Sequence, residues 1–511
     1  MCGIIGYIGN KPLTPILLEG LERLEYRGYD SSGIAVVRDD IIYFRRSTGR
    51  LRNLHDLLTR SPIDGTYGLG HTRWATHGKP CEENTHPLQD CTGRIAVVHN
   101  GIIENHRALK HQLEKDGHRF ISETDTETIA HLVEREMHDD GLEHAVQRAL
   151  AFIKGVFSLA IIATNDPDKI VAVQHGPPLI IGEGNEEFFV SSDVSGFLSH
   201  TKNVAILSDD EMAIVTRQGV EFKKHSGLVV SKTLHHVTWD TAKVDKGDFP
   251  HFTLKEIFEQ PSSVRATLRG RTSNKTQVTL FEDTDFAKKN FQDLERVVLV
   301  ACGSSWNASL VGKFLIEDLT RLPVEVDYGS EFRYRNPIVD SKTLVVGISQ
   351  SGETADTIGA IREARSKGAR TVMICNTPGS TATREAEATI YTQVGPEVGV
   401  AATKTFSSQL VCLYLLTLSL AQVRNALSAD AAASHLEELS QLPQLIEKTL
   451  LCHKAIKSVA EQIHRYSSFL YFGRGILYPI ALEGALKLKE ISYVHAEGYP
   501  AGEMKHGPIA L

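Results

Sequence analysis

The sequence predicts an α+β sandwich over residues 2–240, followed after a linker by an α/β domain with a parallel sheet. Two observations indicate this order. The first part consists of short β-rich runs separated by turns, with few helices between them. Beyond residue 250, apolar strands alternate with loops and helices, which is typical of right-handed βαβ units and a buried parallel sheet.

The first part is made of strand-like runs and two amphipathic helices. The helices are predicted near residues 105–115 and 125–136 from their apolar spacing. Residues 241–250 are polar and contain glycine, which predicts the linker. The strand-like runs are GIIGYIG, GIAVV, GRIAVVHNG, FSLAIIAT, KIVAVQHG and FFVSSD.

A first α/β lobe is predicted at residues 251–430. It opens with three strands, each followed by a loop. These strand–loop runs are RVVLVACGSS, TLVVGISQSGET and RTVMICNTPGS. A helical stretch follows from about residue 404 to 463. Its apolar run Leu410–Ala421 is too short to span a bilayer core of about 30 Å, so we expect a buried helix.

The strand SSFLYFGRG begins a second lobe, predicted at residues 460–511. This length is short beside the roughly 100 residues of an ordinary compact domain. We therefore expect the second lobe to be incomplete and the chain to be truncated.

Composition excludes several classes of function. The formal net charge of -8 is spread among mixed signs without a basic run, which argues against nucleic-acid or membrane partners. The seven cysteines are scattered and form no C-x-x-C pair, and the start MCGIIGYIGN lacks the features of a secretory signal. We expect a reduced, cytoplasmic protein.

Cys2 is the first candidate catalytic residue. Removal of the initiator Met would leave its thiol and its α-amine on one residue. An α-amine with a pKa of about 7.7 to 8.0 titrates near neutrality and would accept the thiol proton. This is the logic of N-terminal nucleophile hydrolases, although an isolated M-C-G is more often an ordinary strand start.

The neighbouring motifs supply what acyl transfer from an α-amino acid requires. Asn100 and Gly101 offer two donors to an oxyanion, although Asn-Gly alone also predicts a hairpin turn. Arg73 would hold a carboxylate and Asp125 an ammonium group. Thr124–Glu127 also fits a helix capping box, and both interpretations of Asp125 are compatible.

These motifs resemble the class II glutamine amidotransferase domain, and specifically isomerising glutamine–fructose-6-phosphate aminotransferases. The segments MCGIIGYIG, LEYRGYDSSGIAV, HTRWATHG, HPL, VHNGIIEN and SETDTETIAHL carry the resemblance. It implies that Cys2 is the nucleophile, that Asn100 and Gly101 form the oxyanion hole, and that glutamine is bound by Arg73, Trp74, Thr76, His77 and Asp125. Trp74 matches the residue that gates ammonia passage. QHGPPLIIG departs from the family, which more often has an Arg and Gly-Ser-Pro there.

Two loops of the second part are candidate phosphate sites. CGSS follows the strand VVLVA, and SQSGET follows LVVGI. Hydroxyls, an amide and helix N-termini hold a phosphate without Lys or Arg, although a single Ser-rich loop is more often a helix cap. Two such loops on successive βα units resemble the sugar-isomerase (SIS) fold. The resemblance implies that a sugar phosphate is bound by Cys302, Ser304, Ser305, Ser349, Gln350, Ser351, Thr354 and Val400. Ser304 and Trp306 stand where the family usually has Thr and Tyr.

The helix ALEGALKLKEISYVHAEGY places Glu483, Lys487 and Glu490 on one face. An exposed ion-pair stripe is the ordinary interpretation, but aldose–ketose interconversion needs a positioned carboxylate base. The resemblance gives Glu490 this role, with Lys487 assisting. It assigns His506, from a neighbouring subunit of a homodimer formed through the SIS domains, to ring opening. The family ends with a Schiff-base lysine and a closing tail, and this sequence stops before both.

We expect no metal and no nucleotide cofactor, because the histidines lack a tight ligand pattern and no phosphate-binding glycine motif is complete. The predicted function is glutamine-dependent conversion of fructose 6-phosphate to glucosamine 6-phosphate, with ammonia passed internally. The alternative is a truncated chain that acts as an uncoupled glutaminase or as a sugar-phosphate-binding regulatory module. Other enzymes of the N-terminal class are disfavoured, because their S-G-G-x-D-S and paired acidic motifs are absent.

Overall fold

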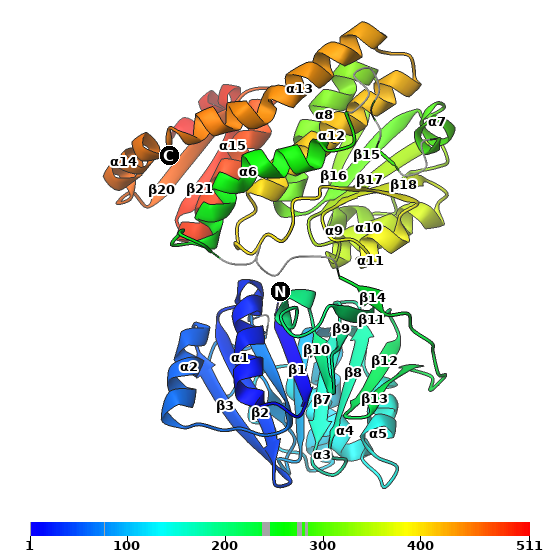
Figure 1. Ribbon diagram of the computed structural model, residues 1–511, viewed down its shortest axis with the longest axis vertical. Helices are drawn as coiled ribbons and strands as arrows, with labels where there is room; N and C mark the ends of the chain where they lie inside the picture. Colours follow the sequence, from blue (N-terminus) through cyan, green and yellow to red (C-terminus); the bar gives the residue numbers. More distant parts are fainter. Residues whose placement is uncertain are drawn as a thin grey trace. The chain divides into compact units, whose positions relative to one another are not determined.

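The computed structural model describes residues 2–75, 77–237, 246–272, 278, 280–281 and 285–510, without the side chain of Tyr26. Two compact units make up the chain, Met1–Thr241 and Ala242–Leu511 (Figure 1). Residues 241–245 of the predicted linker lie outside the described residues, and residues 246–250 are coil and turn. The finer boundaries at 251–430 and 460–511 stay predictions.

The first unit contains two antiparallel sheets. The larger sheet has the order β14-β11-β9-β10-β1-β4-β2-β3, and the smaller has the order β13-β12-β8-β7-β6-β5. The strands of the larger sheet are β1 (Gly3–Gly9), β2 (Ser31–Arg38), β3 (Ile41–Thr48), β4 (Tyr67–Arg73), β9 (Ile180–Glu183), β10 (Glu187–Ser191), β11 (Asn203–Ile206) and β14 (His235–His236). Those of the smaller are β5 (Leu88–Gln89), β6 (Ile95–Ile103), β7 (Gly155–Ala163), β8 (Lys169–His175), β12 (Glu211–Thr216) and β13 (Gly219–Lys224).

Strand β1 is buried on both faces, which explains its continuous apolar sequence. Ile4 and Ile8 point into the core between the two sheets, whereas Ile5 and Tyr7 point into a second core under the outer helices. Because successive side chains of a strand face opposite sides, a strand covered on both faces is apolar at every position. The central place of β1, between β10 and β4, fixes the chain that follows Cys2.

Helices cover the outer faces of both sheets (Figure 1). Helices α1 (Leu13–Leu24) and α2 (Leu51–Arg60) pack on the larger sheet. Helices α3 (His106–Lys115), α4 (Thr126–Glu136) and α5 (Leu142–Leu150) pack on the smaller one. The α+β sandwich and its two predicted helices, α3 and α4, are confirmed. The sequence analysis missed α1, α2 and α5.

The second unit is built on a parallel sheet with the order β16-β15-β17-β18-β19. Its strands are β15 (Arg296–Ala301), β16 (Val324–Tyr328), β17 (Thr343–Ser349), β18 (Arg370–Cys375) and β19 (Ala388–Tyr391). Apolar cores lie on both of its faces, as a doubly wound sheet requires. The helices around it are α6 (Phe252–Leu268), α7 (Phe286–Phe291), α8 (Gly303–Thr320), α9 (Gly329–Tyr334), α10 (Ala355–Ser366) and α11 (Thr381–Glu385).

The rest of this unit follows the predicted order. The helical stretch is three helices, α12 (Lys404–Val423), α13 (Ala429–Leu450) and α14 (His453–Ile463). Strand β20 (Ser468–Gly473), α15 (Leu477–Ser492) and the parallel strand β21 (His495–Pro500) form a further βαβ unit. Short 3₁₀ turns at Ala501–His506 and Pro508–Ala510 follow.

Helix α12 is the most apolar helix of the second unit. Among the described residues it alone is long and apolar enough to cross a membrane by length and composition. Its side chains from Val411 to Ala421 lie mostly in the core on one face of the parallel sheet. The predicted buried helix is confirmed by this packing, although the whole helix is longer than the run Leu410–Ala421 on which the length argument was based.

Candidate active site

Cys2 stands directly before β1, and its main chain is held from two sides. Its carbonyl oxygen accepts hydrogen bonds from Nε of Arg27 and Nδ2 of Asn100, both at 3.0 Å. Its Sγ accepts one from the backbone N–H of Trp74 at 3.2 Å. Burial raises the pKa of the Cys2 thiol, although the Trp74 N–H and the charges of Arg73 and Arg27 oppose that shift. The thiol therefore needs a base to give up its proton near neutral pH.

Asn100 and Gly101 lie inside β6, where they pair with Ser158 and Phe157 of β7. The hairpin-turn alternative is therefore wrong. Gly101 has φ +130°, and a Cβ there would lie 2.0 Å from the carbonyl oxygen of Val156. Only glycine fits this position, since both the backbone angle and the space exclude a side chain.

The amide of Asn100 has a fixed orientation. His71 places Nε2 at 3.1 Å from both Oδ1 of Asn100 and the carbonyl oxygen of His99. Burial lowers the pKa of His71 to about 3, so its ring is neutral and Nε2–H donates to these acceptors. The Nδ2 group is thereby turned toward Cys2, which is the direction that an oxyanion donor requires.

Arg73 is the last residue of β4, and its two terminal guanidinium nitrogens have different surroundings. Its Nη2 donates to the carbonyl oxygens of His77 and Gly78. Its Nη1 is buried without a hydrogen-bond partner in the part of the chain that the structure describes. Burial lowers the pKa of Arg73, and the charges of Cys2, Asp30 and Asp125 oppose that shift. A buried donor of this kind is suited to a ligand carboxylate.

Asp125 is the N-cap residue of α4, yet its side chain caps no helix N–H. Its Oδ2 accepts instead from the backbone N–H of Ile103 at 2.8 Å, which ties it to the end of β6. Glu127 accepts from the N–H groups of Ile121 and Ser122, so the reciprocal capping box does not form. The capping-box interpretation is wrong, but Asp125 does lie at the N-cap, where its charge favours the helix dipole; its binding role stays a prediction.

The remaining predicted residues of this set lie near Arg73 in sequence. Trp74 is 43 % exposed and packs edge-on against Tyr29, with ring centroids 5.3 Å apart. His77 packs against His106 at 5.1 Å. Thr76 lies outside the described residues.

Sequence reasoning missed Arg27 and His71. The available signal was spacing, because His71 and Arg73 are two apart on one strand and therefore share a face. His99 and His86 both bind the Thr126 hydroxyl, at 2.9 and 2.8 Å, directly beside Asp125.

In the second unit the two predicted phosphate loops meet at one edge of the sheet. Ala301 of β15 pairs with Ile348 of the parallel strand β17, so both strands end side by side. The N-cap residues of α8 and α10, Cys302 and Thr354, make no side-chain cap bond. Two helix N-termini thus present backbone N–H groups at the carboxyl end of the sheet, where anions bind.

The SQSGET loop is organised by its own hydroxyls. Ser349 Oγ lies 3.0 Å from the Thr354 hydroxyl and accepts from the N–H of Gly352 at 3.1 Å. Ser351 Oγ accepts from the N–H of Glu353 at 3.1 Å. These bonds shape the loop and leave α10 uncapped, so the helix-cap alternative is not what the structure shows. Gln350 is half-buried beside them.

The loop that carries Val400 is held by two carboxylates, of which Glu256 is buried and Glu397 half-buried. Glu256 accepts from the N–H groups of Val398 and Gly399 at 2.6 and 3.1 Å, and Glu397 accepts from Thr403 N–H at 2.8 Å. Burial raises the pKa of Glu397 to about 7. Val400 itself is 52 % exposed, as a residue that contacts a ligand would be.

The face of α15 with Glu483, Lys487 and Glu490 packs against α8. Lys487 Nζ lies 2.5 Å from Glu490 and 3.4 Å from Glu483, and it donates to the Ser304 hydroxyl at 2.9 Å. Glu483 is 6 % exposed and accepts from Asn307 at 2.8 Å. The exposed-stripe alternative is therefore wrong.

Two further predicted residues of this unit are Ser305, from the sugar-phosphate set, and His506, predicted for ring opening. Ser305 is buried and accepts from Gln409 at 3.0 Å. His506 is exposed in the 3₁₀ turn Ala501–His506, and its role from a second subunit stays a prediction.

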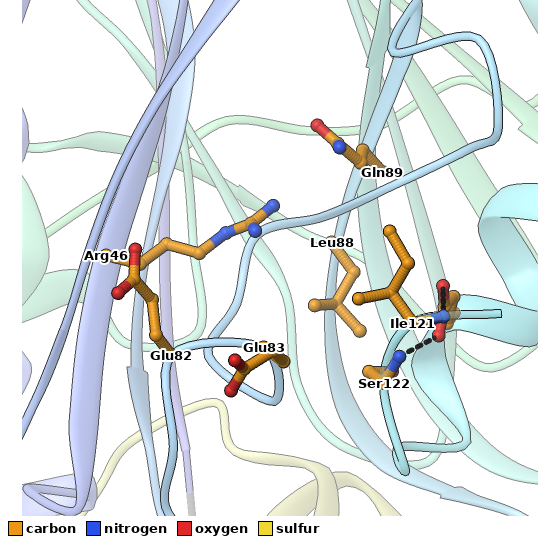
Figure 2. A pocket seen from close by; sticks show the side chains of 8 residues that line it. Arg46, Glu82, Glu83, Leu88, Gln89, Ile121 and Ser122 are labelled. Carbon is orange, nitrogen blue, oxygen red and sulfur yellow. Dashed lines mark hydrogen bonds between the residues drawn. The ribbon is translucent and has the colours of Figure 1, made fainter.

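A separate cavity of about 340 Å³ in the first unit holds none of the predicted residues. Figure 2 shows Arg46 with Glu82 on one side of it and Ile121 with Ser122 on the other. Burial lowers the pKa of Arg46 to about 10, against the charges of Glu82 and Glu127. We assign this cavity no role in the chemistry.

Comparisons with known proteins agree with both halves of the fold. Residues 71–199 match the glutamine amidotransferase domain, and residues 290–419 and 462–511 match the SIS domain. Glutamine–fructose-6-phosphate aminotransferase [isomerizing] of Clostridium tetani is 46 % identical over 511 residues, which are all of this chain and 84 % of the relative. The protein of that name from Chlorobaculum tepidum is 48 % identical over 518 aligned residues, again with 84 % of the relative covered.

A solved structure extends the agreement to the second unit. The C-terminal domain of glucosamine-fructose-6-phosphate aminotransferase from Francisella tularensis matches with a TM-score of 0.50 and 41 % identity, over 52 % of this chain and 74 % of that one. With identity of this level along the whole sequence, the chain belongs to the family of isomerizing glutamine–fructose-6-phosphate aminotransferases.

Proposed function

We propose that this protein transfers the amide nitrogen of glutamine to fructose 6-phosphate and isomerises the product to glucosamine 6-phosphate, the first step of hexosamine synthesis. The first half of the proposal is supported by the hydrogen bonds that Cys2 accepts from Asn100, Arg27 and Trp74. These contacts fix the main chain of the residue that carries the thiol against an amide donor of fixed orientation.

In the first half-reaction, the Cys2 thiolate attacks the carboxamide carbon of glutamine. The α-amine of Cys2 takes the thiol proton and returns it to the departing ammonia. Asn100 Nδ2 and the N–H of Gly101 stabilise the oxyanion, while Arg73 and Asp125 hold the substrate's carboxylate and ammonium groups. Trp74, Thr76 and His77 complete the pocket. Water then hydrolyses the thioester to glutamate.

In the second half-reaction, the uncapped ends of α8 and α10 bind the phosphate of the sugar, with hydroxyls from Ser305, Ser349, Ser351 and Thr354 and the Gln350 amide. Cys302, Ser304 and Val400 contact the sugar. Glu490 moves a proton between adjacent carbons, and Lys487, held between Glu483 and Glu490, assists. His506 aids ring opening from a second subunit.

The partners follow from the same proposal. Glutamine and fructose 6-phosphate are the substrates, and ammonia passes internally because protonation in solvent would make it unreactive. A homodimer through the SIS part is supported by α14, where Ile456, Val459 and Ile463 are exposed and no residue is buried. We place the protein in the cytoplasm, without nucleic-acid or membrane partners.

The test separates the two half-reactions in the full chain. Glutamate and glucosamine 6-phosphate are measured together with both substrates present, for the wild type, Cys2→Ala and Glu490→Gln. Cys2→Ala should lose glutamate formation, whereas Glu490→Gln should retain it and lose the amino sugar. Cys452→Ser and Glu503→Gln, both at exposed positions, are the matched controls.

Glutamate without amino sugar in the wild type would leave an uncoupled glutaminase and contradict the synthase. Glutamate formation that survives Cys2→Ala would contradict the assignment of the nucleophile.

A further inference from the structure

Four residues with metal-binding side chains converge in the first unit, and none of them belongs to the predicted site. Cys91 lies in the turn between β5 and β6, and His118 lies in the loop after α3. His131 and Glu134 are on α4, three residues apart on one face. The fold thus brings together three segments that are separate in sequence, and the chain has no tight ligand motif that would reveal them.

One ligand atom from each residue lies close to those of the other three. The Cys91 Sγ lies 3.5 Å from Nδ1 of His131 and 3.8 Å from Nδ1 of His118. Glu134 Oε2 lies 2.9 Å from Nδ1 of His118 and 3.2 Å from Nδ1 of His131. All four ligand atoms are within 4.8 Å of one another.

These spacings suit a tetrahedral ion. Zinc bonds of about 2.0 to 2.3 Å place tetrahedral ligand atoms roughly 3.3 to 3.8 Å apart. Both sulfur–nitrogen distances already fall in this range, and the two distances to Glu134 need to open by only a few tenths of an ångström. Thiolate and imidazole ligands favour zinc over magnesium or calcium, which prefer oxygen.

Two groups outside the cluster, the Arg119 N–H and the Glu127 carboxylate, lie next to Cys91 and His131, as the outer shell of a metal site does. The backbone N–H of Arg119 donates to the Cys91 sulfur at 3.2 Å, as is typical around a thiolate. Glu127 Oε1 lies 3.6 Å from Nε2 of the buried His131, the nitrogen that faces away from the cluster. At 3.6 Å the pair does not form a hydrogen bond among the described residues, and a shift of a few tenths of an ångström would let Glu127 orient the ring as a carboxylate behind a ligating imidazole does.

We propose that Cys91, His118, His131 and Glu134 bind one Zn²⁺ per chain as a structural site. Four protein ligands fill a tetrahedral shell and leave no position for a substrate or a reactive water. The ion ties α4 to the β5–β6 turn and to the loop after α3. Asp125 is the N-cap of the same helix, so the ion would also steady the proposed glutamine pocket. Only this last consequence rests on the proposed function.

The alternative is a metal-free hydrogen-bonded cluster, since both histidines also contact Glu134. The two interpretations differ in metal stoichiometry. The purified full chain, in a Cys2→Ser background that removes the nucleophilic thiol as a competing ligand, is dialysed against micromolar Zn²⁺ and analysed for bound metal. A parallel sample with Co²⁺ is examined for the thiolate-to-cobalt charge-transfer absorption.

We expect one tightly bound ion per chain, a cobalt–thiolate band, and a higher thermal midpoint of the first unit with Zn²⁺ than with a chelator. Cys91→Ser, a change at an exposed position, should abolish the band, and His118→Ala should release the ion. Glu127→Gln should weaken binding by about 10- to 100-fold without abolishing it. Cys452→Ser and His111→Ala, both exposed, are the matched controls and should bind as the parent does.

Two results would overturn the proposal. One is the absence of bound metal at micromolar free Zn²⁺. The other is binding of unchanged stoichiometry and affinity in the Cys91→Ser, His118→Ala double variant. Because the metal readout needs no glutamine turnover, it is independent of whether the proposed function holds.

Discussion

Replacing Gly101 with alanine should damage both the strand and the chemistry of the first unit. At φ +130° an L-residue is strained, which costs about 1 to 2 kcal/mol. The new Cβ would also lie 2.0 Å from the Val156 carbonyl oxygen and 2.9 Å from the Phe157 Cα. Relief requires β6 and β7 to separate by more than about 1 Å, and overpacking of this kind costs roughly 1 to 3 kcal/mol.

Gly93, in the turn before β6, gives a matched control. It also has positive φ, at +69°, but a Cβ there meets nothing within 4 Å. Gly93→Ala therefore carries the strain alone, and the two variants should differ by about 1 to 3 kcal/mol. That difference corresponds to roughly 5- to 150-fold faster amide hydrogen exchange along β6 in Gly101→Ala.

The same change displaces the N–H proposed for the oxyanion, so glutamate release should fall by about 10²- to 10³-fold in Gly101→Ala and little in Gly93→Ala. Hydrogen exchange followed by mass spectrometry on the full chain measures the first effect, and a glutamate assay the second. Equal exchange along β6 in the two variants would refute the steric argument. Full activity of Gly101→Ala would refute the oxyanion assignment.

Three further changes test other parts of the site. His71→Leu leaves Asn100 Oδ1 without its donor, so kcat for glutamine hydrolysis should fall by about 10- to 100-fold with little change in KM; a change in KM alone would argue against a positioning role. Arg73→Lys loses the planar fork proposed for the substrate carboxylate, so KM for glutamine should rise by about 10-fold or more, and an unchanged KM would contradict the carboxylate assignment. The fold raises the pKa of Glu397 from 4.5 to about 7. Between these two pH values the folded state keeps a proton that the unfolded state has released, so the free energy of unfolding falls as the pH rises from about 4.5 to about 7. Glu397→Gln should therefore gain up to about 3 kcal/mol relative to the wild type between pH 5 and pH 8 in denaturant titrations, and equal pH profiles would contradict this.

The sequence was sufficient for the layers and for most of the order of the elements. Strands buried on both faces, such as β1 and β15, appear as continuous apolar runs, and α3 and α4 have clear helical spacing. Helix α1 was missed because its LTPILLEGLERL begins beside prolines and contains Gly20, which weakens a helical pattern.

The candidate site was only partly accessible from the sequence, for a physical reason. Residues that touch substrate fall in recognisable motifs, but residues that orient them act through space. His71 is on β4 of the larger sheet and Asn100 on β6 of the smaller one, 29 residues apart, and no local spacing encodes a contact between the two sheets. The expectation of no metal relied on local ligand spacing too, and the cluster around Cys91 is assembled by tertiary contacts alone.

Helix α12 has a consequence for how the protein is made. Its apolar stretch would be prone to aggregation if it left the ribosome with nothing to pack against, because an exposed segment of this composition aggregates or enters a bilayer. The helices α6 and α8, against which it packs, precede it in the chain and are synthesised first. The residues that α12 packs against are therefore already synthesised when α12 leaves the ribosome. Mutations that weaken the packing of α6 or α8 should reduce the yield of soluble protein before they reduce activity.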